Sequence, residues 1–260
     1  MEVPSAGIAG ILSTSNMFIN NLSISISESN FEEIYIASRQ SENRVYTDEE
    51  VVQLPFIDPN HIHHDEWQAR KRSSERLKNY LGNKNKPLSI LEIGCGNGWL
   101  SAKLAALKKS TVMGVDINQT ELSQAQRVFS GMSNISFNPG GLKNIHPAKK
   151  FDVIIFAASI QYFPSIERIV RDAFSFLSEA GEIHILDSHF YYPNELESAK
   201  QRSLEYYHST GFDEMADFYF HHSYNTLLNF KHKIIFNPYS LKNKMFRKND
   251  PFPWICIMAS

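Results

Sequence analysis

Between residues 88 and 187 the chain alternates short apolar runs with longer amphipathic segments. The apolar runs have the length of buried strands, and the amphipathic segments repeat apolar residues at helical spacing. This alternation is typical of a mostly parallel sheet covered by helices on both faces, so we expect a doubly wound α/β domain. The expected strands are LSILEI (88–93), TVMGVD (111–116), NISFN (134–138), FDVIIFAAS (151–159) and EIHILD (182–187), and the expected helices are GWLSAKLAALKK (98–109), QTELSQAQRVFSG (119–131) and PSIERIVRDAFSFLSEAG (164–181).

The segment before this core has a different pattern. We interpret residues 1–60 as an N-terminal extension, partly disordered, with its first twenty residues lacking structure. The run NNLSISISESN (20–30) alternates apolar residues with serine at a strand-like period of two, and FEEIYIA (31–37) is expected to pair with it as a hairpin. Helical spacing of apolar residues then predicts a helix from Asp65 to Leu81.

The segment after Asp187 is rich in aromatic residues. We expect two helices there, over NELESAKQRSLEYYHSTG (194–211) and DEMADFYFHHSYNTLLNF (213–230), which form a helical insert on the substrate side over residues 190–230. The runs HKIIFN (232–237) and WICIMA (254–259) are expected to complete a seven-stranded sheet, so that residues 61–260 form one domain. The basic loop KNKMFRK between these two runs is interpreted as solvated.

Composition narrows the class of partner. The 42% hydrophobic and 21% charged residues are ordinary for a globular protein, and the formal net charge of -2 provides no basic field, which makes nucleic acid an improbable partner. No apolar run approaches the roughly 20 residues of a membrane-spanning helix. Two isolated cysteines favour a reducing cytoplasm over a disulfide framework. The oligomeric state stays open.

The stretch LEIGCGNGWLSAKLA contains three glycines between an expected strand and an expected helix. Gly94, Gly96 and Gly98 lie where doubly wound sheets bind ligands, at the carboxyl ends of their strands. The spacing departs from the G-x-G-x-x-G pattern of nicotinamide and flavin sites, because Trp99 stands in place of the last glycine. Glu92 also disfavours a diphosphate, since a carboxylate repels it and instead accepts hydrogen bonds from a cation.

Together, LEIGCGNGWLSAKLA, GVDIN, FDVIIFAASIQYF and GEIHILD resemble the ordered motifs of class I S-adenosylmethionine-dependent methyltransferases, over residues 89–187. The resemblance implies a Rossmann-like methyltransferase fold, S-adenosylmethionine as cofactor and S-adenosylhomocysteine as product. It also implies that Asp116 binds the ribose hydroxyls and that Ile117 lies beside the adenine. The other residues expected at the cofactor are Glu92, Gly94, Cys95, Gly96, Asn97, Gly98, Gly141, Leu142, Ala157 and Arg70.

Two of these expectations are specific to this chain. Many family members carry an acidic residue near the adenine amino group, whereas this chain has Gly141 there, so the contact must come from the backbone near Leu142 or from elsewhere. Arg70, on the leading helix, is expected to pair with the methionine carboxylate or with an acidic substrate.

The acceptor side carries weaker signals. Family members that methylate exocyclic amines of nucleic acids or glutamine amides carry an Asn/Asp-Pro-Pro-aromatic run after the fourth strand, where this chain has AASIQYFPS. We therefore expect methyl transfer by direct displacement to a small organic acceptor enclosed by the aromatic insert. The expected acceptor-side, catalytic residues are His189, Tyr162 and His222. Alternatives are methylation of RNA or protein, a non-catalytic cofactor-binding module, and a nicotinamide oxidoreductase.

A metal site is the last possibility that the sequence raises. The run HIHHDEW places His61, His63 and His64 next to Asp65. The spacing lacks a helical i, i+4 pair, and no distant Cys/His partner stands out, so we expect no metal.

Overall fold

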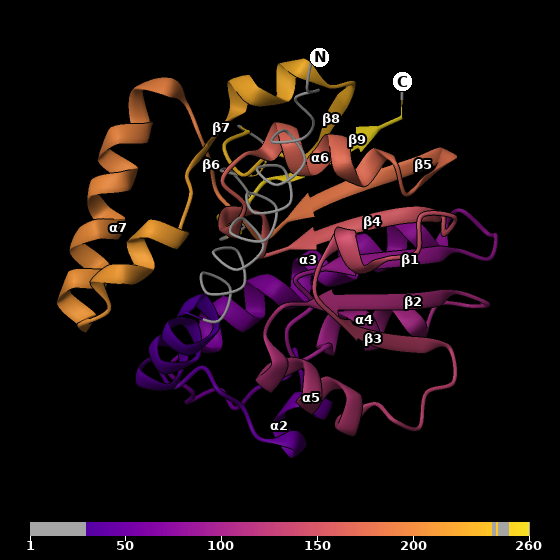
Figure 1. The fold of residues 1–260 in the computed structure, drawn as a ribbon, viewed down its shortest axis with the longest axis horizontal. Coiled ribbons are helices and arrows are strands. Elements are labelled where there is room, and N and C mark those ends of the chain that lie inside the picture. Colours follow the sequence, from indigo (N-terminus) through magenta and orange to yellow (C-terminus); the bar gives the residue numbers. More distant parts are fainter. Residues whose placement is uncertain (1–29, 241–242, 244–249, 260) are drawn as a thin grey trace, which may run out of the picture.

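The computed structural model describes residues 30–240, 243 and 250–259, and these residues form a seven-stranded sheet (Figure 1). The strand order is β3-β2-β1-β4-β5-β9-β8. Strands β1 to β5 pair in parallel, and β9 runs antiparallel to both β5 and β8. This confirms the doubly wound, mostly parallel sheet. The strands are β1 (Ser89–Ile93), β2 (Thr111–Asp116), β3 (Ile135–Pro139), β4 (Phe151–Ala157), β5 (Leu177–Leu186), β8 (His232–Phe236) and β9 (Trp254–Met258).

Both faces of the central strands are buried, which explains why the strands are continuous apolar runs. Successive side chains of a strand point to opposite faces. In β4, Ile154 and Phe156 pack into one core and Val153 and Ile155 into the other. Helix α6 (Ile166–Phe174) packs in the first core, and helices α3 (His64–Gly82) and α4 (Trp99–Ala105) pack in the second. Three further α-helices of the described residues are α2 (Asp48–Gln53), α5 (Gln119–Val128) and α7 (Leu196–Thr210).

The strand order reverses between β1 and β4. Strands β2 and β3 lie on one side of this switch point, and β5, β9 and β8 lie on the other. The turn after β1 is held there because the backbone N–H groups of Gly94 and Cys95 donate to the Val115 carbonyl, at 2.9 and 3.2 Å. The glycine turn therefore lies where a crevice opens in folds of this kind.

The insert between β5 and β8 lies beyond the carboxyl ends of the parallel strands. In Figure 1, α7 stands on the side toward which the arrows of β2 and β4 point. The first expected helix of the insert is present, and it ends at Gly211, which adopts a left-handed φ of 78°.

The second expected helix of the insert, over residues 213–230, is wrong. The segment instead contains two 3₁₀ helices, Asp213–Phe218 and Tyr224–Asn229, on either side of the short strand β7 (His222–Ser223). Strand β7 pairs with β6 (Phe190–Tyr191). Tertiary hydrogen bonds decide this conformation, because the Phe220 N–H donates to the Gln161 carbonyl at 2.7 Å and draws the chain onto the end of β4.

The structure also corrects the start of the described chain. Residues 30–41 form a helix, so the strand expected over residues 31–37 is wrong. Phe31, Tyr35 and Ser38 share one helical face, and the rings of Phe31 and Tyr35 each lie 5.6 Å from the ring of Tyr162. This packing outweighs the local strand pattern. The expected partner strand up to residue 29 and the first twenty residues lie outside the described part of the chain.

The boundary between α6 and β5 differs as well. The sequence indicates a helix up to Gly181, but α6 ends at Phe174 and β5 begins at Leu177. The Phe151 N–H donates to the Phe176 carbonyl at 2.8 Å, so the residues that follow α6 already pair with β4 in the sheet. Within the described ranges, no helix combines the length and apolar character needed to cross a bilayer.

Candidate active site

The glycine turn after β1 has a backbone that favours glycine. Gly94, Gly96 and Gly98 all adopt left-handed φ angles, of 72°, 52° and 75°. The Gly96 N–H donates to the Asp116 carboxylate at 2.7 Å, and the Asn118 N–H donates to its other oxygen at 2.8 Å. The carboxylate at the end of β2 therefore fixes the glycine turn as well as offering acceptor oxygens.

Burial changes the ionisation of two carboxyl groups at this turn. Burial raises the pKa of Glu92 to about 8, against a hydrogen bond donated by Ser101, so Glu92 is mainly neutral at pH 7. Burial also raises the pKa of Asp116, partly offset by the backbone donors. A cationic ligand group beside Glu92 would favour its ionised form. Glu92 is therefore expected to ionise, and to pair with a cation, only when the ligand brings a positive charge to it.

A cavity of about 360 Å³ lies over the glycine turn. Its walls come from the helix of residues 30–41, the start of α3, the ends of β4 and β5, and the insert. The expected site residues that line it are Glu92, Gly94, Cys95, Gly96, Asn97, Ala157, Arg70, His189 and Tyr162. One continuous space thus joins the glycine turn to the segment expected to hold the acceptor.

Six expected residues do not line the cavity. Gly98 caps α4, and Asp116 and Ile117 lie half-buried behind the glycine turn. Gly141 and Leu142 follow β3, where Leu142 is buried in the core. His222 is buried, and its Nε2 lies 3.0 Å from the Ile160 carbonyl oxygen, a contact that anchors the insert.

An aromatic wall lies on the acceptor side of the cavity, and four of its rings, those of Tyr35, Tyr162, Tyr207 and Tyr219, line the cavity. We use this name for Phe31, Tyr35, Tyr162, Tyr207, Phe218 and Tyr219. Their ring centroids are linked at 5.2 to 6.1 Å, although they come from the helix of residues 30–41, the 3₁₀ turn Ile160–Tyr162 and the insert. Burial raises the pKa of Tyr162, which keeps this phenol protonated.

The other end of the acceptor side contains His189 and Asp187. The His189 ring lies 4.6 Å from the ring of Phe252, and burial lowers the His189 pKa. Asp187 is 7% exposed, adopts a φ of 55° and accepts a hydrogen bond from Ser73 at 2.9 Å. Burial raises its pKa to about 6. Strained residues of this kind are concentrated at functional sites, so Asp187 joins the candidate residues.

Several cavity residues were not found by sequence reasoning. Tyr35 lies in the segment expected to be a strand, Arg39 lies two residues after it, and Glu121 belongs to the first turn of α5. Gln161 and Asp187 lay next to expected residues, at the carboxyl ends of β4 and β5. Gln161 and Asp187 could have been found only from the rule that ligands of doubly wound sheets bind at the carboxyl ends of the strands. No periodic signal indicates Tyr35 or Arg39.

Arg70 lies where the sequence placed it, but it already has a partner. Its guanidinium is 2.9 Å from the Glu66 carboxylate and 5.2 Å above the Trp67 ring. Burial raises the pKa of Glu66, but Arg70 and Arg44 outweigh this effect and lower it to about 2. A ligand carboxylate at Arg70 would therefore compete with Glu66.

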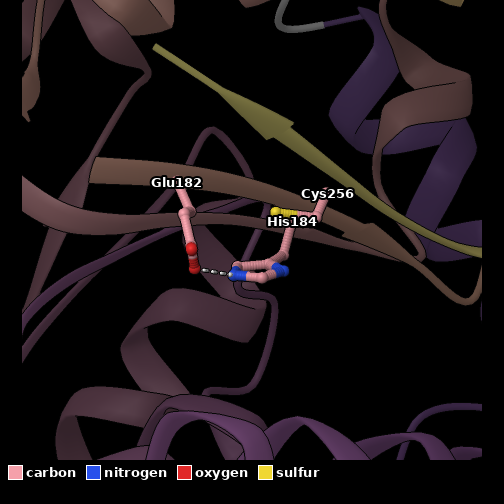
Figure 2. A group of neighbouring side chains, drawn as sticks. All are labelled: Glu182, His184 and Cys256. Atoms are coloured by element: carbon pink, nitrogen blue, oxygen red, sulfur yellow. Dashed lines mark hydrogen bonds and ion pairs between the residues drawn. The ribbon is translucent and has the colours of Figure 1, made fainter. Parts of the chain in front are cut away.

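One cluster away from the cavity has metal-ligating side chains. Glu182, His184 and Cys256 lie with their ligand atoms within 4.8 Å of one another (Figure 2). The Trp254 indole N–H donates to His184 Nδ1 at 3.1 Å, so His184 carries its proton on Nε2 and donates it to Glu182 at 3.3 Å. Metal binding through Nε2 would require the proton on Nδ1, which the indole blocks. The cluster is a buried hydrogen-bond network.

The same network predicts a pH dependence of stability. Burial lowers the pKa of His184 below its ordinary value of 6.5, with Lys84 adding to the effect and Glu182 opposing it. The unfolded chain therefore binds a proton that the folded chain does not. The contribution of His184 to the free energy of unfolding is fully present above pH 6.5 and decreases as the pH falls further.

Urea unfolding between pH 7.5 and 5 would measure this effect. We expect His184→Gln to flatten the acid decline by up to about 1.4 kcal/mol per pH unit. Exposed His208 provides the control, because its His208→Gln variant should retain the parent slope. Identical slopes for the parent and His184→Gln would contradict the prediction. Tyr80 and Lys84, both on or just after α3, contact Glu182 and are left unchanged.

Comparison with known proteins agrees with this geometry. A family model described as a methyltransferase domain matches residues 84–232. The malonyl-[acyl-carrier protein] O-methyltransferase of Halalkalibacterium halodurans is 26% identical over 147 residues, covering 53% of this chain and 54% of that protein. Malonyl-[acyl-carrier protein] O-methyltransferase 1 of Ilyobacter polytropus is 28% identical over 117 residues, 45% of this chain and 44% of that protein.

The chain thus spans about half the length of these curated relatives. Among solved structures, magnesium protoporphyrin IX methyltransferase from Synechocystis PCC 6803, with bound S-adenosylhomocysteine, superposes with a TM-score of 0.58. It is 15% identical in sequence, and the match covers 91% of this chain and 99% of that one. This similarity shows a shared fold.

Proposed function

This chain belongs to the methyltransferase-domain family, and we propose that it is an enzyme that transfers a methyl group from S-adenosylmethionine to a small organic acceptor. The family match confirms the resemblance to class I S-adenosylmethionine-dependent methyltransferases. The observation that carries the proposal is the single cavity that joins the glycine turn to the aromatic wall. Cofactor and acceptor can therefore lie next to each other in this space.

The residues at the glycine turn suit this cofactor. Gly94 and Gly96 line the cavity, and their left-handed backbone conformations are ones that glycine adopts without strain, so we place the amino-acid part of the cofactor against this main chain. Glu92 is buried and mainly neutral at pH 7. A cationic group of the ligand beside it would stabilise its ionised form and would be attracted to it in turn. The bound cofactor supplies a methyl group on a sulfonium. Ile117, just after β2, and the main chain near Leu142, after β3, remain our candidates for the adenine side.

The aromatic wall would hold the acceptor and exclude water. Transfer by direct displacement requires the acceptor atom to lie in line with the bond that breaks, and placement of this kind can lower a barrier by roughly 7–11 kcal/mol. Tyr162, His189 and Asp187 are the side chains available to orient the acceptor or take its proton. Both bacterial relatives are named O-methyltransferases, so oxygen acceptors are the first class to test.

The direct test supplies S-adenosylmethionine and pools of small organic molecules and measures formation of S-adenosylhomocysteine. Calorimetry with S-adenosylhomocysteine and with NADH provides the binding arm. Binding of NADH alone would contradict the proposal. Tight binding of S-adenosylhomocysteine without turnover across broad pools would instead indicate a non-catalytic module, and turnover only with RNA or protein would overturn the small-molecule assignment.

Asp116 gives a sharper prediction. Asp116→Ala removes two acceptor oxygens proposed for the ribose and releases the Gly96 N–H. We expect the dissociation constant of S-adenosylhomocysteine, measured by calorimetry, to rise by roughly 10- to 100-fold. Asp152→Ala is the matched control. Its carboxylate also accepts a backbone hydrogen bond, from Ser89 at 2.9 Å, but at the opposite end of β1. Equal affinities for the two variants would contradict the role of Asp116.

A further inference from the structure

Three arginines line the cavity, and two of them have carboxylate partners. Arg44 pairs with Glu42 at 2.8 Å and also donates to Glu66. Arg70 pairs with Glu66 at 2.9 Å. The charges of these two arginines are therefore balanced within the protein, and both guanidinium groups are held in place.

Arg39 differs from both. Its Nε is buried and has no hydrogen-bond acceptor, and the described part of the chain places no carboxylate in ion-pair contact with its guanidinium. Its guanidinium carbon lies 5.7 Å from the centroid of the Tyr35 ring. Arg39 as a whole is half-buried, and an anion in the cavity would give its buried Nε the hydrogen-bond acceptor that it lacks.

The surroundings of Arg39 identify where such an anion would lie. The carboxylates that act on it at longer range are Glu121 and Glu66, and Glu66 already binds the other two arginines. Burial raises the pKa of Glu121 to about 7, so Glu121 offsets the charge of Arg39 only in part at neutral pH. Tyr35 and Tyr162 flank Arg39, and both belong to the aromatic wall.

We propose that Arg39 binds a carboxylate of the methyl acceptor, so that the acceptor is an organic acid. The inference rests on the proposed function, which assigns the aromatic wall to the acceptor. The planar guanidinium matches a carboxylate with two parallel hydrogen bonds. The rings of Tyr35 and Tyr162 enclose the carbon skeleton beside it, and their hydroxyl groups are additional donors.

The experiment measures binding of matched acids and amides to the protein saturated with S-adenosylhomocysteine. The probes are benzoate against benzamide and octanoate against octanamide, which differ only in the charged group. We expect the unaltered protein to prefer each acid by about tenfold or more. Arg39→Gln should abolish this preference, and Arg39→Lys should retain part of it because the charge remains. Arg44→Gln is the control and should keep the preference, since its guanidinium is already paired.

Three results would overturn the inference. They are the absence of any preference for acids in the unaltered protein, a preference that survives in Arg39→Gln, and a loss of affinity in that variant for S-adenosylhomocysteine but not for 5′-methylthioadenosine. The last result would assign Arg39 to the carboxylate of the cofactor instead. If Arg39→Gln does not fold, Arg39→Lys decides: a reduced preference for the acids is expected, and a preference equal to that of the unaltered protein would overturn the inference. Failure of the unaltered protein to bind S-adenosylhomocysteine at all would count against the proposed function, not against Arg39 in particular.

Discussion

Replacement of Gly96 by valine is expected to raise the dissociation constant of S-adenosylhomocysteine by about 100-fold or more, which corresponds to roughly 2.7 kcal/mol. Gly96 has a φ of 52°, a conformation that costs an L-residue about 1–2 kcal/mol. A Cβ there would lie 3.1 Å from the Glu121 carboxylate, at the end of a flexible side chain, and the added methyl groups would occupy cofactor space. The fold should therefore survive while binding is lost. Calorimetry measures the affinity, and circular dichroism checks the fold.

Gly211→Ala is the control for backbone strain. Gly211 has a φ of 78°, but its Cβ would meet nothing within 4 Å, and it ends α7 outside the cavity lining. It should therefore lose stability without losing affinity. If Gly96→Val bound S-adenosylhomocysteine as tightly as the unaltered protein, the placement of the cofactor over the glycine turn would be wrong.

Replacement of Gly98 by valine is expected to lower the free energy of unfolding, because here the added side chain meets the core and not the cavity. The Gly98 φ is 75°, and a Cβ would lie 2.5 Å from Phe137 Cζ and 2.9 Å from the Ala125 Cβ. Both neighbours are buried, at 8% and 0% exposure, so neither can move aside cheaply. Overpacking of about 1–3 kcal/mol adds to the strain of a left-handed L-residue. We expect a loss of about 3 kcal/mol, or roughly 6–12 °C in Tm.

Differential scanning calorimetry of the two variants separates the roles of the two glycines. Gly96→Val should lose only the stability that corresponds to backbone strain of about 1–2 kcal/mol, or roughly 2–8 °C in Tm, whereas Gly98→Val should melt further below the unaltered protein or accumulate as insoluble chain. A Gly98→Val protein with unchanged Tm would show that Phe137 and Ala125 can rearrange, contrary to their burial. The two glycines are two residues apart, and the difference arises because one faces the cavity and the other faces the small core under α5.

The sheet was predictable from sequence because each strand can be recognised from its own run of apolar residues. β2 occupies the expected residues Thr111–Asp116, and β1, β3, β4, β8 and β9 begin and end within two residues of the expected bounds. Both faces of the central strands are buried, so their apolar runs have few alternative structures. Helix α3 has the same clarity, since its buried residues recur at helical spacing. Where the expectations were wrong, in residues 31–37, 177–181 and 213–230, the local pattern was weak and distant contacts decided the conformation.

The candidate site divides in the same way. The glycine turn and Asp116 are adjacent in the fold because parallel strands β1 and β2 end at one edge, which a sequence pattern can predict. Tyr35 and Arg39 could not be found, since their place in the cavity depends on a helix packing against Tyr162, more than a hundred residues away in the chain. Arg70 was found, but its pairing with Glu66 is visible only in the folded protein.

Between residues 88 and 187, the sequence alone determined the order of strands and helices, the glycine turn and the cofactor class, because these depend on residues close together in the chain. The tertiary structure alone decided which side chains surround the acceptor. The aromatic wall arises where separate segments meet over the strand ends, and so does the setting of Arg39, which has no ion-pair partner among the described residues. Burial in that shared space shifts the pKa values of Glu92, Glu121 and Asp187. How deeply a group is buried depends on how the whole chain folds.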